Sequence, residues 1–177
     1  PLPVNKCLGC EHTMVDTTVT GKKVRQMVYN MEPFMVSCVD AYLTLSKRDR
    51  SSLKFAATPF LDEDKVVEDC AKDPEGHKGT LQPIASSVLM KVLYAARLAR
   101  FDLLKAVANL AQKVTKWDKG CDRMLHRLMC YINSSLDLRL KGHIGDKPAD
   151  LVLSLYSDAD FAGDKESSKS TSGIFIA

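Results

Sequence analysis

The sequence predicts an α+β fold: an N-terminal β-hairpin and helix, a central three-helix unit and a C-terminal β-hairpin. Three observations lead to this prediction. Residues 4–29 are rich in β-branched residues around a Thr20-Gly21 turn, residues 88–132 repeat apolar positions at helical spacing, and residues 151–176 return to short β-rich runs. With 177 residues, 45% hydrophobic and 27% charged, the chain can bury one moderate core or two small ones.

The first 82 residues divide into two predicted regions. Residues 1–46 contain the hairpin, or pair of strands, and a helix over residues 33–46, because Pro33 suits the first turn of a helix. Residues 47–82 are expected to form a polar connector, since they combine an acidic run with Pro and Gly. The helix would present an apolar surface of Phe34, Val36, Cys38, Val39, Tyr42, Leu43 and Leu45.

Residues 83–147 are predicted to form three amphipathic helices and then a strand. The third helix has the cleanest apolar stripe, so residues 83–135 should be the best-ordered unit. Residues 136–140 alternate as a strand, and Gly142 to Pro148 are expected to form a loop. The helical apolar positions are Val88, Leu89, Val92, Leu93 and Ala96; then Leu103, Leu104, Val107, Leu110, Ala111 and Val114; then Cys121, Met124, Leu125, Leu128, Met129 and Ile132.

Residues 148–177 are predicted to form the C-terminal hairpin. Alternation over residues 151–155 is typical of a strand buried on at least one face, and Gly173–Ile176 would form the returning strand. The first strand would deliver Asp158 to its end, just before a polar turn. A carboxylate in this position is a common ligand of divalent metals, because rigid backbone fixes its oxygen.

Charge is unevenly distributed along the chain. The net charge is only +3, but residues 60–79 carry seven acids against three lysines, a net of −4. Residues 85–145 carry eleven Lys or Arg against four Asp, a net of +7. Within this basic region Lys116, Lys119, Arg123 and Arg127 recur at three- and four-residue steps, away from the apolar stripe. Such a row can neutralise successive phosphates of nucleic acid; the alternative is a solvated helix face.

The cysteines and the ends of the chain indicate its setting. Six cysteines without a secretory signal are expected to be reduced thiols of an intracellular, non-secreted protein. The chain has no run of about 18 apolar residues, so we expect no membrane partner. It begins with Pro1 and ends inside the predicted hairpin, which suggests a piece of a longer open reading frame.

Two sets of residues contain the element types of zinc ligands. One is Cys7-x-x-Cys10 with His12 nearby, and no second ligand pair follows it at the usual spacing. The other is Cys121, His126 and Cys130, where Cys121 and His126 would point about 140° apart on a helix. Structural thiols are therefore favoured over metal ligands at both places. Trp117 is expected to be a core residue or a helix-end anchor.

The most specific motif of the chain lies at its C-terminal end. Leu-Tyr-Ser-Asp-Ala-Asp-Phe-Ala-Gly-Asp at residues 155–164, then Lys-Ser-Thr-Ser-Gly-Ile-Phe-Ile at residues 169–176, resembles the opening of the RNase H domain in copia-type retrotransposon Pol polyproteins. Phe101, where the family usually has Pro, and Asn133-Ser134, in place of a common Lys-Gly, depart from the family pattern. Other motifs in the family's order are Cys7-Leu8-Gly9-Cys10-Glu11, Lys54-Phe55-Ala56-Ala57-Thr58-Pro59, Leu89-Met90-Lys91-Val92-Leu93-Tyr94, Ala99-Arg100-Phe101-Asp102-Leu103, Trp117 and Arg127-Leu128-Met129-Cys130-Tyr131-Ile132.

The resemblance implies a parent enzyme that is an RNA-directed DNA polymerase and cleaves the RNA strand of RNA–DNA hybrids. Asp158 matches the first carboxylate that holds Mg²⁺ in a complete RNase H-like domain, and Leu8 and Gly9 match the strand that grips the primer. The polymerase Tyr-x-Asp-Asp motif and the other RNase H carboxylates do not occur in this chain. Since one carboxylate cannot hold two metal ions, we expect the chain to be inactive alone, with no cofactor of its own.

The resemblance also implies the domain boundaries and partners. Residues 1–46 would be the primer-grip and thumb-like end of a reverse transcriptase, residues 83–147 its connection helices, and residues 148–177 the first hairpin of a truncated RNase H-like domain. Expected partners are RNA–DNA hybrid or duplex nucleic acid and the rest of the Pol polyprotein, in a cytoplasmic particle or the nucleus. The alternative is a degraded or repurposed helical module that binds nucleic acid or protein without catalysis.

Overall fold

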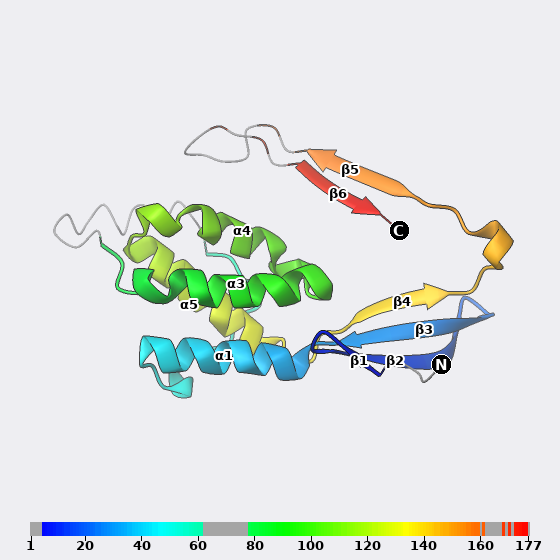
Figure 1. Ribbon diagram of the computed structural model, residues 1–177, viewed down its shortest axis with the longest axis horizontal. Helices are drawn as coiled ribbons and strands as arrows, with labels where there is room; N and C mark the ends of the chain where they lie inside the picture. The colour runs from blue at the N-terminus through cyan, green and yellow to red at the C-terminus, as the bar shows by residue number, and fades with distance from the viewer. Residues whose placement is uncertain are drawn as a thin grey trace.

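The computed structural model describes residues 5–61, 78–159, 161, 168, 170 and 172–176. These residues form an α+β structure, as the sequence predicts, with a four-stranded antiparallel sheet, four α-helices and a separate two-stranded hairpin. The helices lie side by side, the larger sheet continues from one end of them, and the hairpin lies apart from both (Figure 1). No described helix is long and apolar enough to cross a membrane.

Two tight turns build most of the larger sheet, which contains β1 (Lys6–Cys7), β2 (Cys10–Val19), β3 (Lys22–Asn30) and β4 (Leu140–Ile144) in that order. Leu8-Gly9 joins β1 to β2, and Thr20-Gly21 joins β2 to β3. Both residues of each turn have positive φ, the geometry that matches the twist of paired strands. The predicted N-terminal hairpin is therefore confirmed, with a short third strand added.

The strand predicted over residues 136–140 is displaced along the chain, so that prediction is wrong in its boundaries. β4 begins at Leu140 and includes Gly142, which the sequence placed in a loop. Leu136 and Asp137 instead form a turn. Arg139, which follows it, donates to the carbonyl oxygens of Leu136 and Leu138 and pairs with Glu32 of α1. Pairing with β3, from Tyr29 opposite Leu140 to Arg25 opposite Ile144, decides where the strand lies.

The four helices share one hydrophobic core, so the expected unit of three helices is enlarged. They are α1 (Glu32–Ser46), α3 (Gln82–Leu98), α4 (Leu104–Gln112) and α5 (Lys119–Ser134). α1 packs against α3 and α5, which joins the N-terminal part of the chain to the helices that follow. The side chains with at most 1% exposure include Met31, Met35, Val39, Tyr42, Leu89, Val92, Leu103, Val107, Leu125, Leu128 and Ile132.

The predicted stripe of the last helix is buried at every position except one. Cys121, Leu125, Leu128, Met129 and Ile132 lie in the core, whereas Met124 is only half-buried at its edge. Trp117 is a core residue, as expected.

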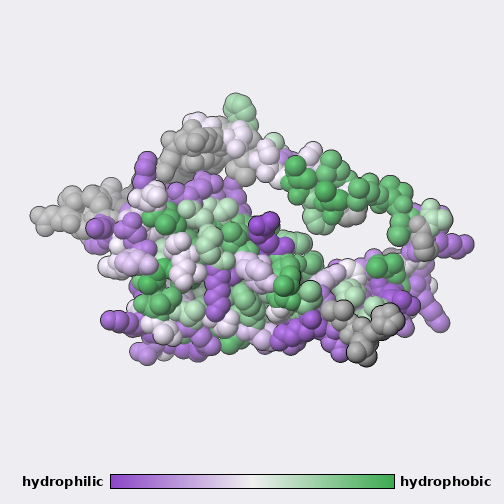
Figure 2. All heavy atoms as spheres, in the orientation of Figure 1, coloured by the Kyte–Doolittle hydropathy of each residue, from purple (hydrophilic) through white to green (hydrophobic). Residues whose placement is uncertain are grey.

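The C-terminal hairpin is present, but it is not buried. β5 (Leu155–Ala159) pairs with β6 (Ser172–Ile176), with Tyr156 opposite Phe175 and Asp158 opposite Gly173. Every residue of both strands is exposed, and Figure 2 shows the apolar surface of the hairpin. The strand predicted over residues 151–155 is therefore wrong in two respects. β5 begins only at Leu155, so Asp158 lies within the strand, and neither face is buried because no described element covers it.

Candidate nucleic-acid interface

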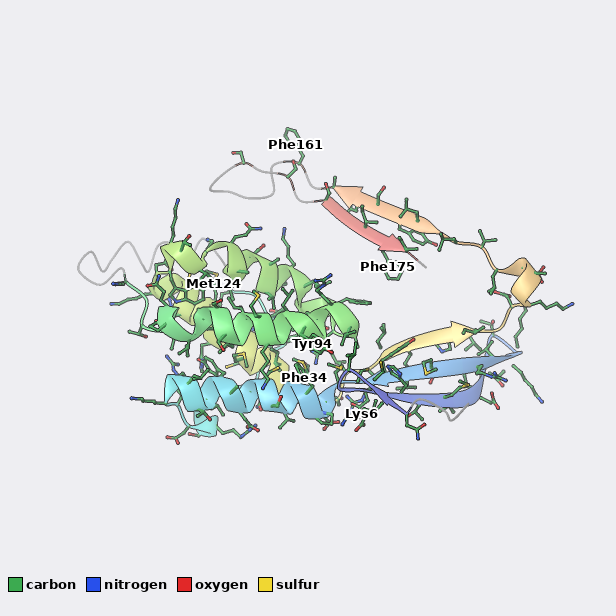
Figure 3. The ribbon with its side chains drawn as sticks, viewed as in Figure 1. Lys6, Phe34, Tyr94, Met124, Phe161 and Phe175 are labelled. Atoms are coloured by element: carbon green, nitrogen blue, oxygen red, sulfur yellow. The ribbon has the colours of Figure 1, made fainter. Side chains whose placement is uncertain are left out.

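The Leu8-Gly9 turn is the first candidate contact, and it is fixed to two helices. The Tyr94 hydroxyl of α3 donates to the carbonyl oxygen of Leu8 at 2.6 Å. The ring of Tyr94 packs on that of Phe34 in α1, with centroids 5.3 Å apart. Phe34, Tyr94 and Lys6 of β1 gather where the helices meet the sheet (Figure 3). Leu8 is thus exposed, whereas the backbone of its turn is held in place by contacts with α1 and α3.

The four cations of the predicted row lie on two elements. Lys116 ends a short 3-10 helix, Val114–Lys116, which precedes Trp117, whereas Lys119 is the first residue of α5. Lys116 and Lys119 are exposed, and Arg123 and Arg127 are half-buried. The row therefore presents its cations unequally to a ligand.

Residues 52–58 explain why Arg127 is half-buried. This segment lies along α5: Arg127 Nε donates to the Thr58 carbonyl at 2.9 Å, and the Ala56 amide donates to Ser134 Oγ at 3.1 Å. His126 Nε2 lies 3.2 Å from the Ser52 carbonyl oxygen. Part of the predicted polar connector thus packs on the same side of α5 as Arg127, which has a structural contact of its own.

Asp158 lies on β5, on the face it shares with Tyr156 and Phe175. Its side chain is exposed. Among the described residues no group of three or more His, Cys, Asp or Glu could hold a metal ion. Asp160 and Asp164 of the same motif lie outside the described residues. Among the described residues Asp158 is thus an exposed carboxylate with no other carboxylate grouped around it.

The cysteines of the described chain are mostly core residues. Cys7 is exposed, whereas Cys10, Cys38, Cys121 and Cys130 are buried. Burial raises the pKa of the Cys38 and Cys121 thiols to about 12, and it also raises that of Cys10. Buried thiols held in the neutral form are poor nucleophiles and metal ligands.

Asp122 is a structural anchor that the sequence analysis did not identify. Its carboxylate, on α5, accepts hydrogen bonds from the Thr80 amide at 2.7 Å, the Thr80 hydroxyl at 2.8 Å and the Leu81 amide at 3.0 Å. It also accepts one from Trp117 Nε1 at 2.6 Å. It therefore satisfies amides just before α3, which helix starts otherwise leave unpaired. The sequence separation of 41 residues between Leu81 and Asp122 hides this contact.

Arg100 explains the Arg-Phe-Asp-Leu motif. Its guanidinium is 2% exposed and donates to both carboxylate oxygens of Asp102, at 3.0 and 2.8 Å, and to the carbonyl and hydroxyl oxygens of Ser135. Tyr131 also donates to Asp102, at 2.9 Å. Burial acts to raise the pKa of the Asp102 carboxyl, but the hydrogen bonds and charge of Arg100 outweigh it and lower the pKa. The motif thus fastens the start of α4 to the end of α5.

His126 joins α5 to α1 and to the segment beside it. Nδ1 lies 2.9 Å from the Tyr42 hydroxyl, and Nε2 faces the Ser52 carbonyl. Because a carbonyl only accepts, Nε2 carries the proton and Nδ1 accepts from Tyr42 in the neutral ring. Burial, with the charge of Arg48 as a second cause, lowers the pKa of His126.

Comparison of the chain with protein-family models, with curated proteins and with solved structures finds no match in any of the three. The geometry of the described residues offers a clamped exposed turn and a set of cations at one end of α5. The cations are suited to contact a polyanion.

Proposed function

We propose that this chain is part of a copia-type retrotransposon Pol polyprotein and that it contributes nucleic-acid contacts rather than catalysis. The parent activity would be RNA-directed DNA synthesis with RNase H cleavage of RNA–DNA hybrids, inside the cell. The observation that carries the proposal is the C-terminal motif, residues 155–164 and 169–176. Its described strands pair as a hairpin with Asp158 opposite Gly173.

The exposure of the hairpin supports the same proposal. Leu155, Ile174 and Ile176 share one face, and Tyr156 and Phe175 share the other, because directly opposed residues project to the same side of a sheet. A strand pair that is apolar on both faces is suited to the interior of a larger α/β domain, such as an RNase H-like fold. In that setting Asp158 would be one of several carboxylates that hold two Mg²⁺ ions, one activating water and the other stabilising the leaving oxygen.

A nuclease and polymerase assay tests the catalytic half of the proposal. The chain alone should not extend a primer, because it contains no Tyr-x-Asp-Asp motif. It should not hydrolyse the RNA strand of an RNA–DNA hybrid with Mg²⁺ either, because Asp158 lacks partner carboxylates among the described residues. Steady hydrolysis that disappears in Asp158→Asn would contradict this expectation.

Binding measured across salt concentrations tests the other half. The chain should bind an RNA–DNA hybrid with little sequence preference and with an affinity that falls steeply as salt rises. Reversing Lys116 and Lys119 to Glu should flatten the dependence of log affinity on log salt by roughly 1–2 units. Lys116 and Lys119 are chosen for this test because both are exposed, whereas Arg123 and Arg127 are half-buried and Arg127 donates a hydrogen bond to the Thr58 carbonyl.

The matched control reverses Lys22 and Lys23 to Glu, at the start of β3, with the same change of net charge. If both double variants change the salt dependence equally, the effect is one of overall charge and the predicted row is not a site.

A non-enzymatic helical module is the second candidate function, because the described core is closed and the hairpin is not part of it. The coding sequence on either side of this chain discriminates the two. A Tyr-x-Asp-Asp motif upstream and further RNase H carboxylate motifs downstream support the polyprotein proposal, whereas unrelated or interrupted sequence supports a repurposed module.

A further inference from the structure

Leu8 adopts a backbone conformation that does not suit its side chain. Its φ of 51° lies in the left-handed region, which leucine rarely adopts and which Gly, Asn or Asp usually occupy in such turns. The side chain is 71% exposed, so it gains little from burial in this protein. The needs of folding alone therefore favour another residue at this position. Thr20 has the same backbone strain, so what distinguishes Leu8 is its large, exposed apolar side chain and the support of the turn that carries it.

The turn between β2 and β3 provides an internal comparison. Thr20-Gly21 has nearly the same dihedrals, with φ of 48° and 81° against 51° and 82° for Leu8-Gly9. Nothing lies within 4 Å of the position a Cβ would take on Gly21, and the Thr20 hydroxyl bonds only to the adjacent Val19 carbonyl. The two turns have the same backbone shape, yet only one is fastened to the helices.

The support of the Leu8-Gly9 turn comes from α1 and α3. Tyr94 donates to the Leu8 carbonyl at 2.6 Å, and Phe34 Cδ2 lies 3.7 Å from the Cβ position of Gly9. Lys91 holds Phe34 in turn, since its Nζ lies 5.8 Å from the ring centroid and donates to the Ser37 carbonyl at 3.0 Å. The Tyr94 hydroxyl thus makes the hydrogen bond that connects Leu8 to the helices.

We propose that Tyr94 is a positioning residue, which holds the Leu8-Gly9 turn so that the Leu8 side chain meets the sugar edge of a nucleic-acid duplex. This inference rests on the proposed function and adds the residue that sets its geometry. Leu8 supplies an apolar contact with deoxyribose or ribose, and Lys6, exposed on β1 beside the turn, pairs with a phosphate. Tyr94 acts through the Leu8 backbone and does not touch the duplex.

Two glycine substitutions separate the contact from the strain. Leu8→Gly and Thr20→Gly each relieve a left-handed backbone, so each should raise the melting temperature or leave it unchanged. Leu8→Gly should also weaken binding to an RNA–DNA hybrid at one fixed salt concentration by about three- to tenfold, because it removes a buried apolar contact. Thr20→Gly should leave the affinity unchanged.

Two phenylalanine substitutions test Tyr94. Tyr94→Phe keeps the ring and removes the hydrogen bond to Leu8, and it should weaken binding by about three- to tenfold. Tyr131→Phe, which removes the hydrogen bond to Asp102, is the control and should lower stability without changing the affinity. In the Leu8→Gly background Tyr94→Phe should have little further effect on affinity, because the contact that it positions is absent.

Each outcome has a distinct meaning. If the wild-type chain fails to bind the hybrid, the proposed function and this inference both fall. If it binds but Leu8→Gly and Tyr94→Phe match wild type, the inference alone is overturned and the turn is structural. Additive losses in the double variant would also overturn the positioning role, because Tyr94 would then act independently of Leu8.

Discussion

The helical core and the C-terminal hairpin are both rich in apolar residues, but these residues are buried in the core and exposed in the hairpin. In the core, the apolar positions of α3, α4 and α5 meet one another and α1, and side chains such as Leu128 and Ile132 are wholly buried. The hairpin lies apart from the helices and presents an apolar surface (Figures 1 and 2). Its Ile174 is 73% exposed. Periodicity thus predicts which local structure forms, whereas burial depends on whether other elements reach that structure.

The largest expected effect on stability comes from truncating one isoleucine in the core and, for comparison, one in the hairpin. Ile132→Ala in α5 should cost about 2–5 kcal/mol of unfolding free energy, because it removes a fully buried side chain and leaves a cavity. Ile174→Ala in β6 should change it by less than about 0.5 kcal/mol. Urea unfolding, followed by circular dichroism, measures both. Equal losses would show that the hairpin is packed in solution and would remove the contrast.

A second pair compares two aspartates. Asp122→Asn should cost about 1–3 kcal/mol, because the amide nitrogen replaces either the oxygen that accepts from Thr80 or the oxygen that accepts from Leu81 and Trp117, and one of these sets of donors loses its acceptor. Asp158→Asn should leave stability unchanged, since this side chain is exposed on the hairpin. The same unfolding measurement applies, with Trp117 fluorescence as a local signal. A neutral Asp122→Asn would mean that the Asp122 contacts contribute little to the core.

The smallest expected effect is a change in how stability depends on pH, and it arises from His126, at the contact between α5 and α1. The folded-state pKa of His126 is lowered from 6.5, so its contribution to stability is present above pH 6.5 and is lost as the pH falls through that value towards the folded pKa. His126→Gln should therefore flatten the fall in melting temperature between about pH 7 and 5. A profile parallel to wild type would show that His126 does not cause the acid sensitivity.

Much of the fold could be predicted because its signals are local. The helical stripes, Pro33 near a helix start and the Thr20-Gly21 turn each act within a few residues. β4 was misplaced because its position depends on β3, more than 100 residues earlier in the sequence. Met124 was expected in the core and lies at its edge, since the direction from which α1, α3 and α4 approach α5 is a tertiary property.

The candidate site could be predicted as a set of residues but not as a surface. Lys116, Lys119, Arg123 and Arg127 have helical spacing, but the spacing does not show that α5 begins at Lys119 or that Thr58 covers Arg127. Tyr94 could be found only in three dimensions, since its partner Leu8 is 86 residues away. Asp158 remains an assignment by resemblance.

The shortness of β1 has a consequence for β2. β1 covers only the first residues of β2, where the His12 amide donates to the Asn5 carbonyl, so among the described residues the edge from Thr13 to Val19 has no strand beside it. Amides in an antiparallel strand point alternately to its two neighbours. Those of Met14, Asp16 and Thr18 point the same way as that of His12, towards water, so they should exchange hydrogen for deuterium rapidly. Thr13, Val15 and Thr17 donate towards β3 and should exchange slowly, so that every second amide along one strand is protected.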